Sequence, residues 1–268
     1  MKFKWLCCAD TDESIKQSDP TPPNQPSALL ARRISTFLQK NSETLNHLVK
    51  PNLENSEALD FPILSLQIEE TLTEKMQFKY RIFYYGLENS ETHSGIVYFS
   101  QDSNSELIVT SDSSPAHQSL CIFFDHNQRK YFIKDLDLTT FVKIQKDLHI
   151  EGRLLISFID KRIIVAADKT AIRIKAVETD ESFEFLDQDS PITVGRSETC
   201  SVKIFGKNIS RIQCTFYYEQ GWVVKDGGNS VSLNGTWFMP IDQTEVVEGM
   251  VFNANKTIFS VKLENHNV

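Results

Sequence analysis

Three turn motifs that follow one another in the second half of the chain constrain its fold more than any other feature. They are VGR at Val194–Arg196, NISRIQC at Asn208–Cys214 and SLNGTW at Ser232–Trp237. Aromatic and β-branched runs such as Phe216–Tyr218 and Trp222–Val224 lie between them, and such runs are typical of strands. The Asn234-Gly235 dipeptide favours a tight turn, because both residues tolerate a positive φ. The sequence therefore predicts short strands joined by three exposed turns.

The side chains on these turns are those that an oxyanion requires. Arg196 and Arg211 each offer a fork of donors with fixed positive charge, Ser210 offers a hydroxyl and Asn234 an amide. Between Gly195 and Gln213 there are four basic residues and one acidic residue, although the formal net charge of the whole chain is −8. We therefore expect a local anion-binding site on an otherwise acidic protein.

The three motifs together resemble the forkhead-associated (FHA) domain, a phosphothreonine-binding β-sandwich. That family has Gly-Arg, then Ser-Arg-x-His, then Ser-x-Asn-Gly-Thr. The matching positions here are Gly195, Arg196, Ser210, Arg211, Ser232, Asn234, Gly235 and Thr236. Gln213 stands where the family usually has His, whose role is to support the loop. Because Gln also donates and accepts hydrogen bonds, we expect a weakened or reorganised loop rather than loss of the site.

The resemblance covers about the last third of the chain and implies a role for each matching residue. Arg196 and Arg211 would bind the phosphate and the loop, Ser210 would donate its hydroxyl to a phosphate oxygen, and Asn234 would hold the ligand backbone. A structural part falls to four further positions: Gly195, Gln213, Gly235 and Thr236. The alternative is a turn architecture that is kept without a ligand.

An internal repeat emerges when the preceding segment is compared with this one at an offset of about 96 residues. The coinciding positions are Ser210 with Ser114, Gln213 with His117, and Asn234 with Leu138. Gly195-Arg196 falls near Ser100-Gln101, one residue out of register. Without an arginine there, we expect this first repeat to be a degenerate FHA-like sandwich that does not bind phosphate. The alternative is an unrelated β domain with a chance offset.

The expected fold class is mainly β, with two tandem FHA-like β-sandwiches preceded by a disordered tail and one N-terminal helix. Residues 1–60 hold the tail, a Pro-rich linker and the helix, predicted at 27–49. Residues 61–168 form the degenerate FHA-like sandwich and residues 169–268 the FHA domain.

Five cysteines without CxxC spacing argue against a disulfide framework or a zinc site and indicate an intracellular, cytoplasmic or nuclear protein. The start, MKFKWLCCAD, has too short an apolar core for a signal peptide. Cys7 and Cys8 follow basic and interfacial residues, a pattern that suits dual S-acylation and peripheral membrane association. The alternative is a frayed tail whose cysteines have no role.

The acidic net charge argues against nucleic acid as a partner. The sequence has no HExxH, GxSxG or P-loop pattern, so we expect no enzyme, no cofactor and no metal. The expected function is a phosphothreonine-peptide binding module that mediates phosphorylation-dependent protein–protein interaction, with a phosphorylated protein as partner. The alternative is a phosphate-independent scaffold that uses the FHA-like sandwiches as an interaction surface.

Overall fold

The computed structural model describes residues 61–70, 79–91, 94–101, 107–110, 118–240, 243–254 and 256–264. All of them belong to one compact unit. They hold twenty-one strands and one 3-10 helix, Asp187–Asp189, and no α-helix occurs in these ranges. The prediction of a mainly β protein is thus confirmed. The predicted tail and the helix at 27–49 lie outside the described residues.

The strands surround two hydrophobic cores, and we call the strands around each core a lobe. The first lobe contains one five-stranded sheet in the order β5-β4-β6-β7-β19. Its strands are β4 (Ile96–Gln101), β5 (Leu107–Thr110), β6 (Gln118–Asp125), β7 (Lys130–Asp135) and β19 (Thr244–Glu245). Its other layer is part of an eleven-stranded sheet, in the order β3-β2-β1-β21-β20-β8. These strands are β1 (Ile63–Glu70), β2 (Lys79–Phe83), β3 (Gly86–Leu87), β8 (Phe141–Lys143), β20 (Val251–Ala254) and β21 (Thr257–Glu264).

The second lobe has the same arrangement, with a five-stranded sheet in the order β15-β14-β16-β17-β9. Its strands are β9 (Leu148–His149), β14 (Ile192–Gly195), β15 (Val202–Lys203), β16 (Cys214–Tyr218) and β17 (Trp222–Asp226). The rest of the eleven-stranded sheet forms its other layer, in the order β13-β12-β11-β10-β18. These strands are β10 (Arg153–Phe158), β11 (Lys161–Ala167), β12 (Ala171–Ala176), β13 (Ser182–Leu186) and β18 (Trp237–Phe238).

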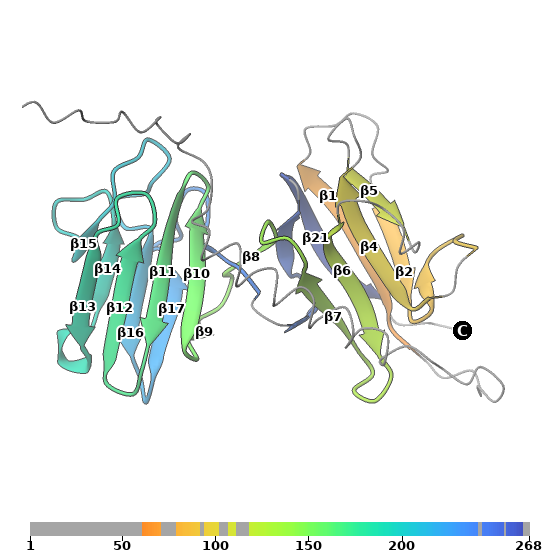
Figure 1. The fold of residues 1–268 in the computed structure, drawn as a ribbon, viewed down its shortest axis with the longest axis horizontal. Helices are drawn as coiled ribbons and strands as arrows, with labels where there is room; N and C mark the ends of the chain where they lie inside the picture. The colour runs from red at the N-terminus through yellow and green to blue at the C-terminus, as the bar shows by residue number, and fades with distance from the viewer. Residues whose placement is uncertain are drawn as a thin grey trace, which may run out of the picture. The chain divides into compact units, whose positions relative to one another are not determined.

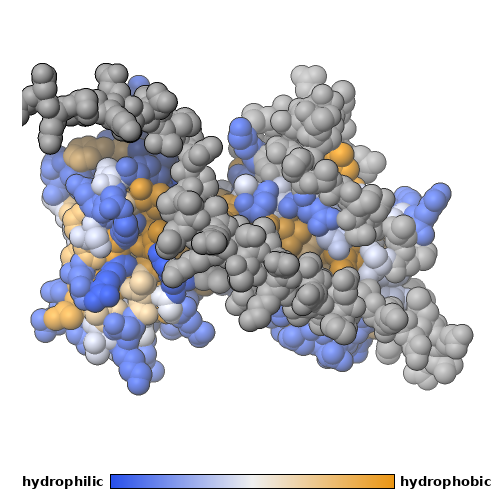
Figure 2. All heavy atoms as spheres, in the orientation of Figure 1, coloured by the Kyte–Doolittle hydropathy of each residue, from blue (hydrophilic) through white to orange (hydrophobic). Residues whose placement is uncertain are grey.

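Alternation of side chains explains why these segments form half-buried strands. In β12, Ile172 and Ile174 are fully buried, whereas Arg173 between them is exposed. A period of two places the isoleucines on one face of the strand, which then packs on the core. Hydrophobic areas also reach the surface, and some are visible in Figure 2 among the hydrophilic residues.

The second lobe is one continuous piece of sequence, whereas the first lobe is not. The second core takes its residues from Ile144 to Val224. The first core combines residues up to Val142 with residues from Val246 to Val261. Figure 1 shows the result for the first lobe, where β21 (dark blue) lies beside β1 (orange). The second lobe is therefore inserted into the first.

The expected boundary between residues 168 and 169 falls inside the second lobe. It separates β11 from β12, which pair with each other along Ile163–Ala167. Residues 144–167 thus complete the second lobe, and residues 244–264 complete the first. The chain passes from the first lobe to the second after β8 and returns to the first after β18. The two strands at the crossing, β8 and β18, pair with each other through Lys143–Trp237 and Val142–Phe238.

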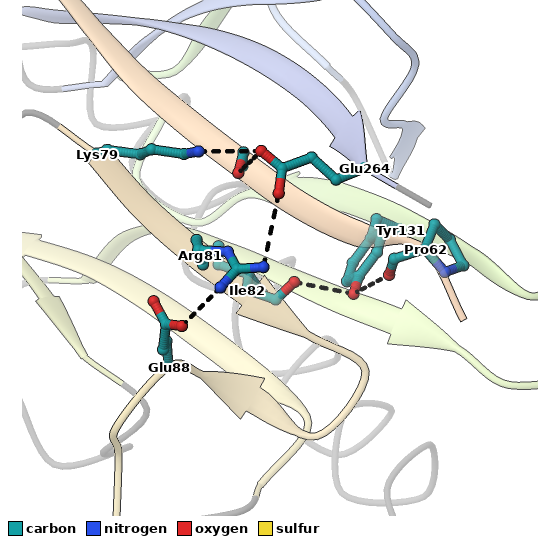
Figure 3. Close-up of polar contacts among 8 residues, drawn as sticks. Pro62, Lys79, Arg81, Ile82, Glu88, Tyr131 and Glu264 are labelled. Carbon is teal, nitrogen blue, oxygen red and sulfur yellow. Dashed lines mark hydrogen bonds and ion pairs between the residues drawn. The ribbon is translucent and has the colours of Figure 1, made fainter. Parts of the chain in front are cut away.

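Side chains also hold β21 in the first lobe (Figure 3). Glu264 Oε1 accepts hydrogen bonds from Lys79 Nζ at 2.9 Å and from Ser65 Oγ at 3.0 Å. The Lys79 bond, with help from Ser65 and Arg81, holds the pKa of Glu264 below its usual value. Nearby, the hydroxyl of the buried Tyr131 lies 2.9 Å from Pro62 O and 3.0 Å from Ile82 O. Strands from the two ends of the described chain therefore share one polar network.

The lobe boundaries predict how fragments behave. Residues 144–240 should fold alone, because they contain every strand of the second lobe. Residues 169–268 should not, because they lack the buried side chains of Ile156, Phe158, Ile163 and Val165. Four such side chains contribute roughly 6–12 kcal/mol by burial, as much as the whole stability of a typical domain.

Urea unfolding followed by circular dichroism separates the two fragments, with residues 61–268 as the reference. A cooperative transition in 169–268 together with none in 144–240 would show that β10 and β11 do not belong to the second lobe.

Candidate functional site

The candidate site lies on three loops of the second lobe, which follow β14, β15 and β17. Arg196 is on the first loop, Ser210 and Arg211 are on the second, and Asn234 is on the third. The backbone joins the first two loops directly. Arg196 N donates to Ser210 O at 3.0 Å, and Ser197 N donates to Arg211 O at 3.1 Å. The structure therefore brings all four expected ligand-binding residues onto adjoining loops.

Gln213 connects the second loop to the third. Its side chain is fully buried, and its Oε1 accepts a hydrogen bond from Ser210 N at 2.9 Å. Its Nε2 donates to Ser232 Oγ and to Gly235 O, each at 2.9 Å. Both amide protons and the carbonyl are thus used, so the amide fixes the backbone on either side of Asn234.

Asp226 is a positioning residue that the sequence analysis did not single out. Its Oδ1 lies 2.6 Å from both Ser232 Oγ and Thr236 Oγ1, and its Oδ2 accepts from Ser232 N at 2.9 Å. Thr236 Oγ1 also lies 2.9 Å from Gln213 O. The signal in the sequence was an Asp at the end of a strand run, directly before Gly227-Gly228, where Asp side chains often organise a turn.

Two positions of the motif require glycine for structural reasons. A Cβ at Gly195 would lie 2.3 Å from Arg211 O, so only glycine permits the close approach of the first two loops. Gly235 has a φ of +75°, in the left-handed region that favours glycine. Both positions shape the loops and offer no side chain to a ligand.

The polar groups that the sequence analysis assigned to ligand binding remain available. Arg196 and Arg211 are exposed, and neither guanidinium makes an ion pair with a residue that the structure describes. Ser210 Oγ accepts from Leu233 N at 2.9 Å, which leaves its proton free to be donated. Asn234 Nδ2 donates to Asn208 O at 2.9 Å, which orients the amide. Lys203 differs, because it pairs with Glu198.

The corresponding corner of the first lobe keeps the turn and lacks the ligand-binding groups. Asp135 takes the place of Asp226 and accepts from Leu138 N at 2.7 Å and Thr140 N at 2.9 Å. Burial raises the pKa of this carboxyl to about 6. Leu138 occupies the turn in place of an asparagine, with a φ of +66°.

Backbone bonds also correct the offset between the two lobes. Leu136 N donates to Ser119 O as Gly227 N donates to Gln213 O, so Ser119 corresponds to Gln213. The sequence comparison placed His117 there, two residues away. Ser114 and His117 lie outside the described residues, as do Cys7 and Cys8.

No catalytic or metal chemistry is indicated in the parts of the chain described. Burial raises the pKa of the Cys214 thiol well above its usual value and that of Cys121 to about 12, so neither is a thiolate near neutral pH. The described ranges contain no group of three His, Cys, Asp or Glu side chains that could hold a metal ion. They also contain no helix that is long and apolar enough to cross a membrane.

The second lobe is a layered β domain that carries two exposed arginines, Arg196 and Arg211, on its loops. Comparison with family models gives it a name, because residues 192–253 match the FHA domain. The chain therefore carries an FHA domain in its C-terminal part, as the motifs predicted. FHA domains are non-catalytic modules that bind phosphopeptides and mediate protein–protein interaction. No curated protein and no solved structure matches the chain.

The matched range crosses the boundary between the lobes. Its last strands, β19 and most of β20, pair in the first lobe, where Thr244 lies opposite Ile133 and Phe252 opposite Phe259. In the second lobe, β9 and β10 take the corresponding places in the sheets. The core beneath the FHA motif is thus built partly from residues 144–174, which lie outside the matched range.

Replacing Gln213 with Leu tests its part in the site. The change leaves the Ser210 N–H, the Ser232 hydroxyl and the Gly235 carbonyl without this partner, which should destabilise the protein by roughly 1–3 kcal/mol. Urea unfolding measures the loss. Gln145→Leu, at an exposed position of the same lobe, is the control and should change stability by less than about 0.5 kcal/mol. Equal stability of the two variants would contradict the role of Gln213.

Proposed function

We propose that the second lobe binds peptides that contain phosphothreonine, and that the chain thereby mediates phosphorylation-dependent contact with another protein. The observation that carries the proposal is the pair of exposed guanidinium groups, Arg196 and Arg211, on loops that are already hydrogen-bonded to each other. Arginine forms short, charge-assisted hydrogen bonds with phosphate oxygens in a fixed fork geometry.

Each side chain has a distinct part in the proposed complex. Arg196 and Arg211 bind the phosphate, and the free proton of Ser210 is donated to a phosphate oxygen. Asn234 binds the ligand backbone through its Oδ1 and its second amide proton, because the bond from Nδ2 to Asn208 O uses one of the two protons. Since the loops are held in place without a ligand, little conformational entropy is lost on binding.

Charge supports a local, phosphate-dependent site. A phosphorylated residue carries about −1.5 to −2 at neutral pH, and a chain with a formal net charge of −8 repels it at long range. Attraction must therefore come from the few cations on the loops. We expect binding that is short-ranged and weakened by salt.

The domain organisation that we propose follows the strand order. The two lobes are FHA-like sandwiches that have exchanged their C-terminal strands, and the first lobe has no phosphate site because Gln101 and Leu138 replace the Arg and the Asn. Its part is structural: it supplies the strand β8 that pairs with β18 at the edge of the second lobe.

A phosphate-independent scaffold is the second candidate function. One observation favours it: Phe205, Val231 and Leu233 are 72%, 81% and 84% exposed on the loops of the site. Such apolar side chains could bind a partner without any phosphate.

Arg196→Ala is the decisive variant. We expect it to weaken phosphopeptide binding by at least roughly tenfold, or about 1.4 kcal/mol, because it removes a charged donor to the phosphate. Calorimetric titration of the full chain with a degenerate phosphothreonine peptide pool measures the effect. Arg173→Ala is the matched control, since Arg173 is an exposed arginine of the same lobe that pairs with Glu184.

The pool without phosphate separates the two candidate functions. Equal binding of both pools, unchanged by Arg196→Ala, would reject the phosphate site and favour the scaffold.

A further inference from the structure

One basic residue from outside the matched FHA range lies against the site. Lys143, the last residue of β8, pairs with Trp237 across the strands. Its Cε lies 2.6 Å from the position that a Cβ would take at Gly235, and its Nζ lies 5.8 Å from the centroid of the Trp237 ring. Trp237 Nε1 in turn donates to Asn234 O at 3.0 Å. Lys143 therefore runs along the corner that presents Asn234.

This corner is fixed, so the position of the lysine is defined. Ile144 N donates to Thr236 O at 2.8 Å, which ties the residue after Lys143 to the end of the third loop. The aliphatic part of the lysine packs on Gly235, and the side chain is half-buried. A lysine packed by its methylene groups keeps its charged end toward water.

The charged end is also available. Three cations of the second lobe are neutralised by neighbours: Lys203 pairs with Glu198, Arg173 with Glu184 and Lys175 with Asp180. Lys143 makes no ion pair with any residue in the described ranges. The Trp237 ring faces it with a weakly attractive π surface, which leaves the ammonium able to bind an anion.

We propose that Lys143 is a specificity-determining residue of the peptide site and binds an acidic side chain of the bound phosphopeptide. The inference rests on the proposed function of the second lobe. Asn234 would hold the ligand backbone beside the phosphothreonine, and Lys143 lies on the Gly235 and Trp237 side of Asn234. The carboxylate that it binds therefore belongs to a residue that flanks the phosphothreonine. The first lobe thereby contributes to ligand choice although it has no phosphate site of its own.

Two phosphothreonine peptide pools test the proposal on the full chain. In one pool the positions that flank the phosphothreonine are enriched in Glu, and in the other the same positions carry Gln. We expect the unchanged protein to bind the Glu pool roughly two- to fivefold more tightly, the size expected of one exposed ion pair. Lys143→Gln should abolish this preference and leave the affinity for the Gln pool unchanged, whereas Lys143→Arg should retain it.

Lys146→Gln is the matched control, because Lys146 is an exposed lysine three residues further on, outside the three site loops. It should keep the preference for Glu. A preference that survives in Lys143→Gln, or no preference in the unchanged protein, would overturn the inference while the phosphate site stands. Equal weakening of both pools in Lys143→Gln would also overturn it, since the lysine would then only support the loop.

Arg196→Ala distinguishes failure of the inference from failure of the function. It should weaken the binding of both pools without removing the ratio between them. If the unchanged protein binds neither pool in a phosphate-dependent way, the proposed function and the inference are both overturned.

Discussion

Pairing between strands from distant parts of the sequence is the constraint on which the rest of the structure depends. β1 pairs with β21 in the first lobe, and β10 pairs with β18 in the second. Each pairing closes a sheet over a core that would otherwise expose apolar side chains such as Leu66 or Ile163, both fully buried. Because the loops of the site connect strands of these sheets, their geometry depends on strands that lie outside the motif.

Within the site, the buried amide of Gln213 likewise holds separate segments of the chain together. A tight set of turns leaves backbone and hydroxyl groups inside the protein, where an unpaired group is costly. A neutral imidazole offers one donor and one acceptor, whereas an amide offers two donors and an acceptor. Gln213 uses all of them in hydrogen bonds to Ser210, Ser232 and Gly235. These three bonds explain physically why glutamine suits a position where the family usually has His.

The sequence predicted the local features well, because they depend on neighbouring residues. The β-rich fold and the strand alternation at Ile172 and Ile174 follow from composition and period, and the FHA domain follows from the resemblance of the three turn motifs to that family. The assignment of residues 144–167 to the second lobe does not follow from the sequence, since Ile163 and Val165 carry the same alternating apolar pattern as Phe259 and Val261 and would suit either core. A uniform offset also missed that Ser119 corresponds to Gln213, because the turns differ in length: Thr236 follows Asp226 by ten positions, whereas Thr140 follows Asp135 by five.

The insertion of one lobe into the other sets the order in which a growing chain can complete them. The hydrogen bond from Ser65 to Glu264 joins residues 199 positions apart, so the first lobe waits for the final strand to be synthesised. The second lobe needs only the continuous stretch from Ile144 to Phe238. The part that carries the FHA motif can therefore close before β1, β7 and β8 have met their partners β21, β19 and β20, and the lobe that is synthesised first is finished last.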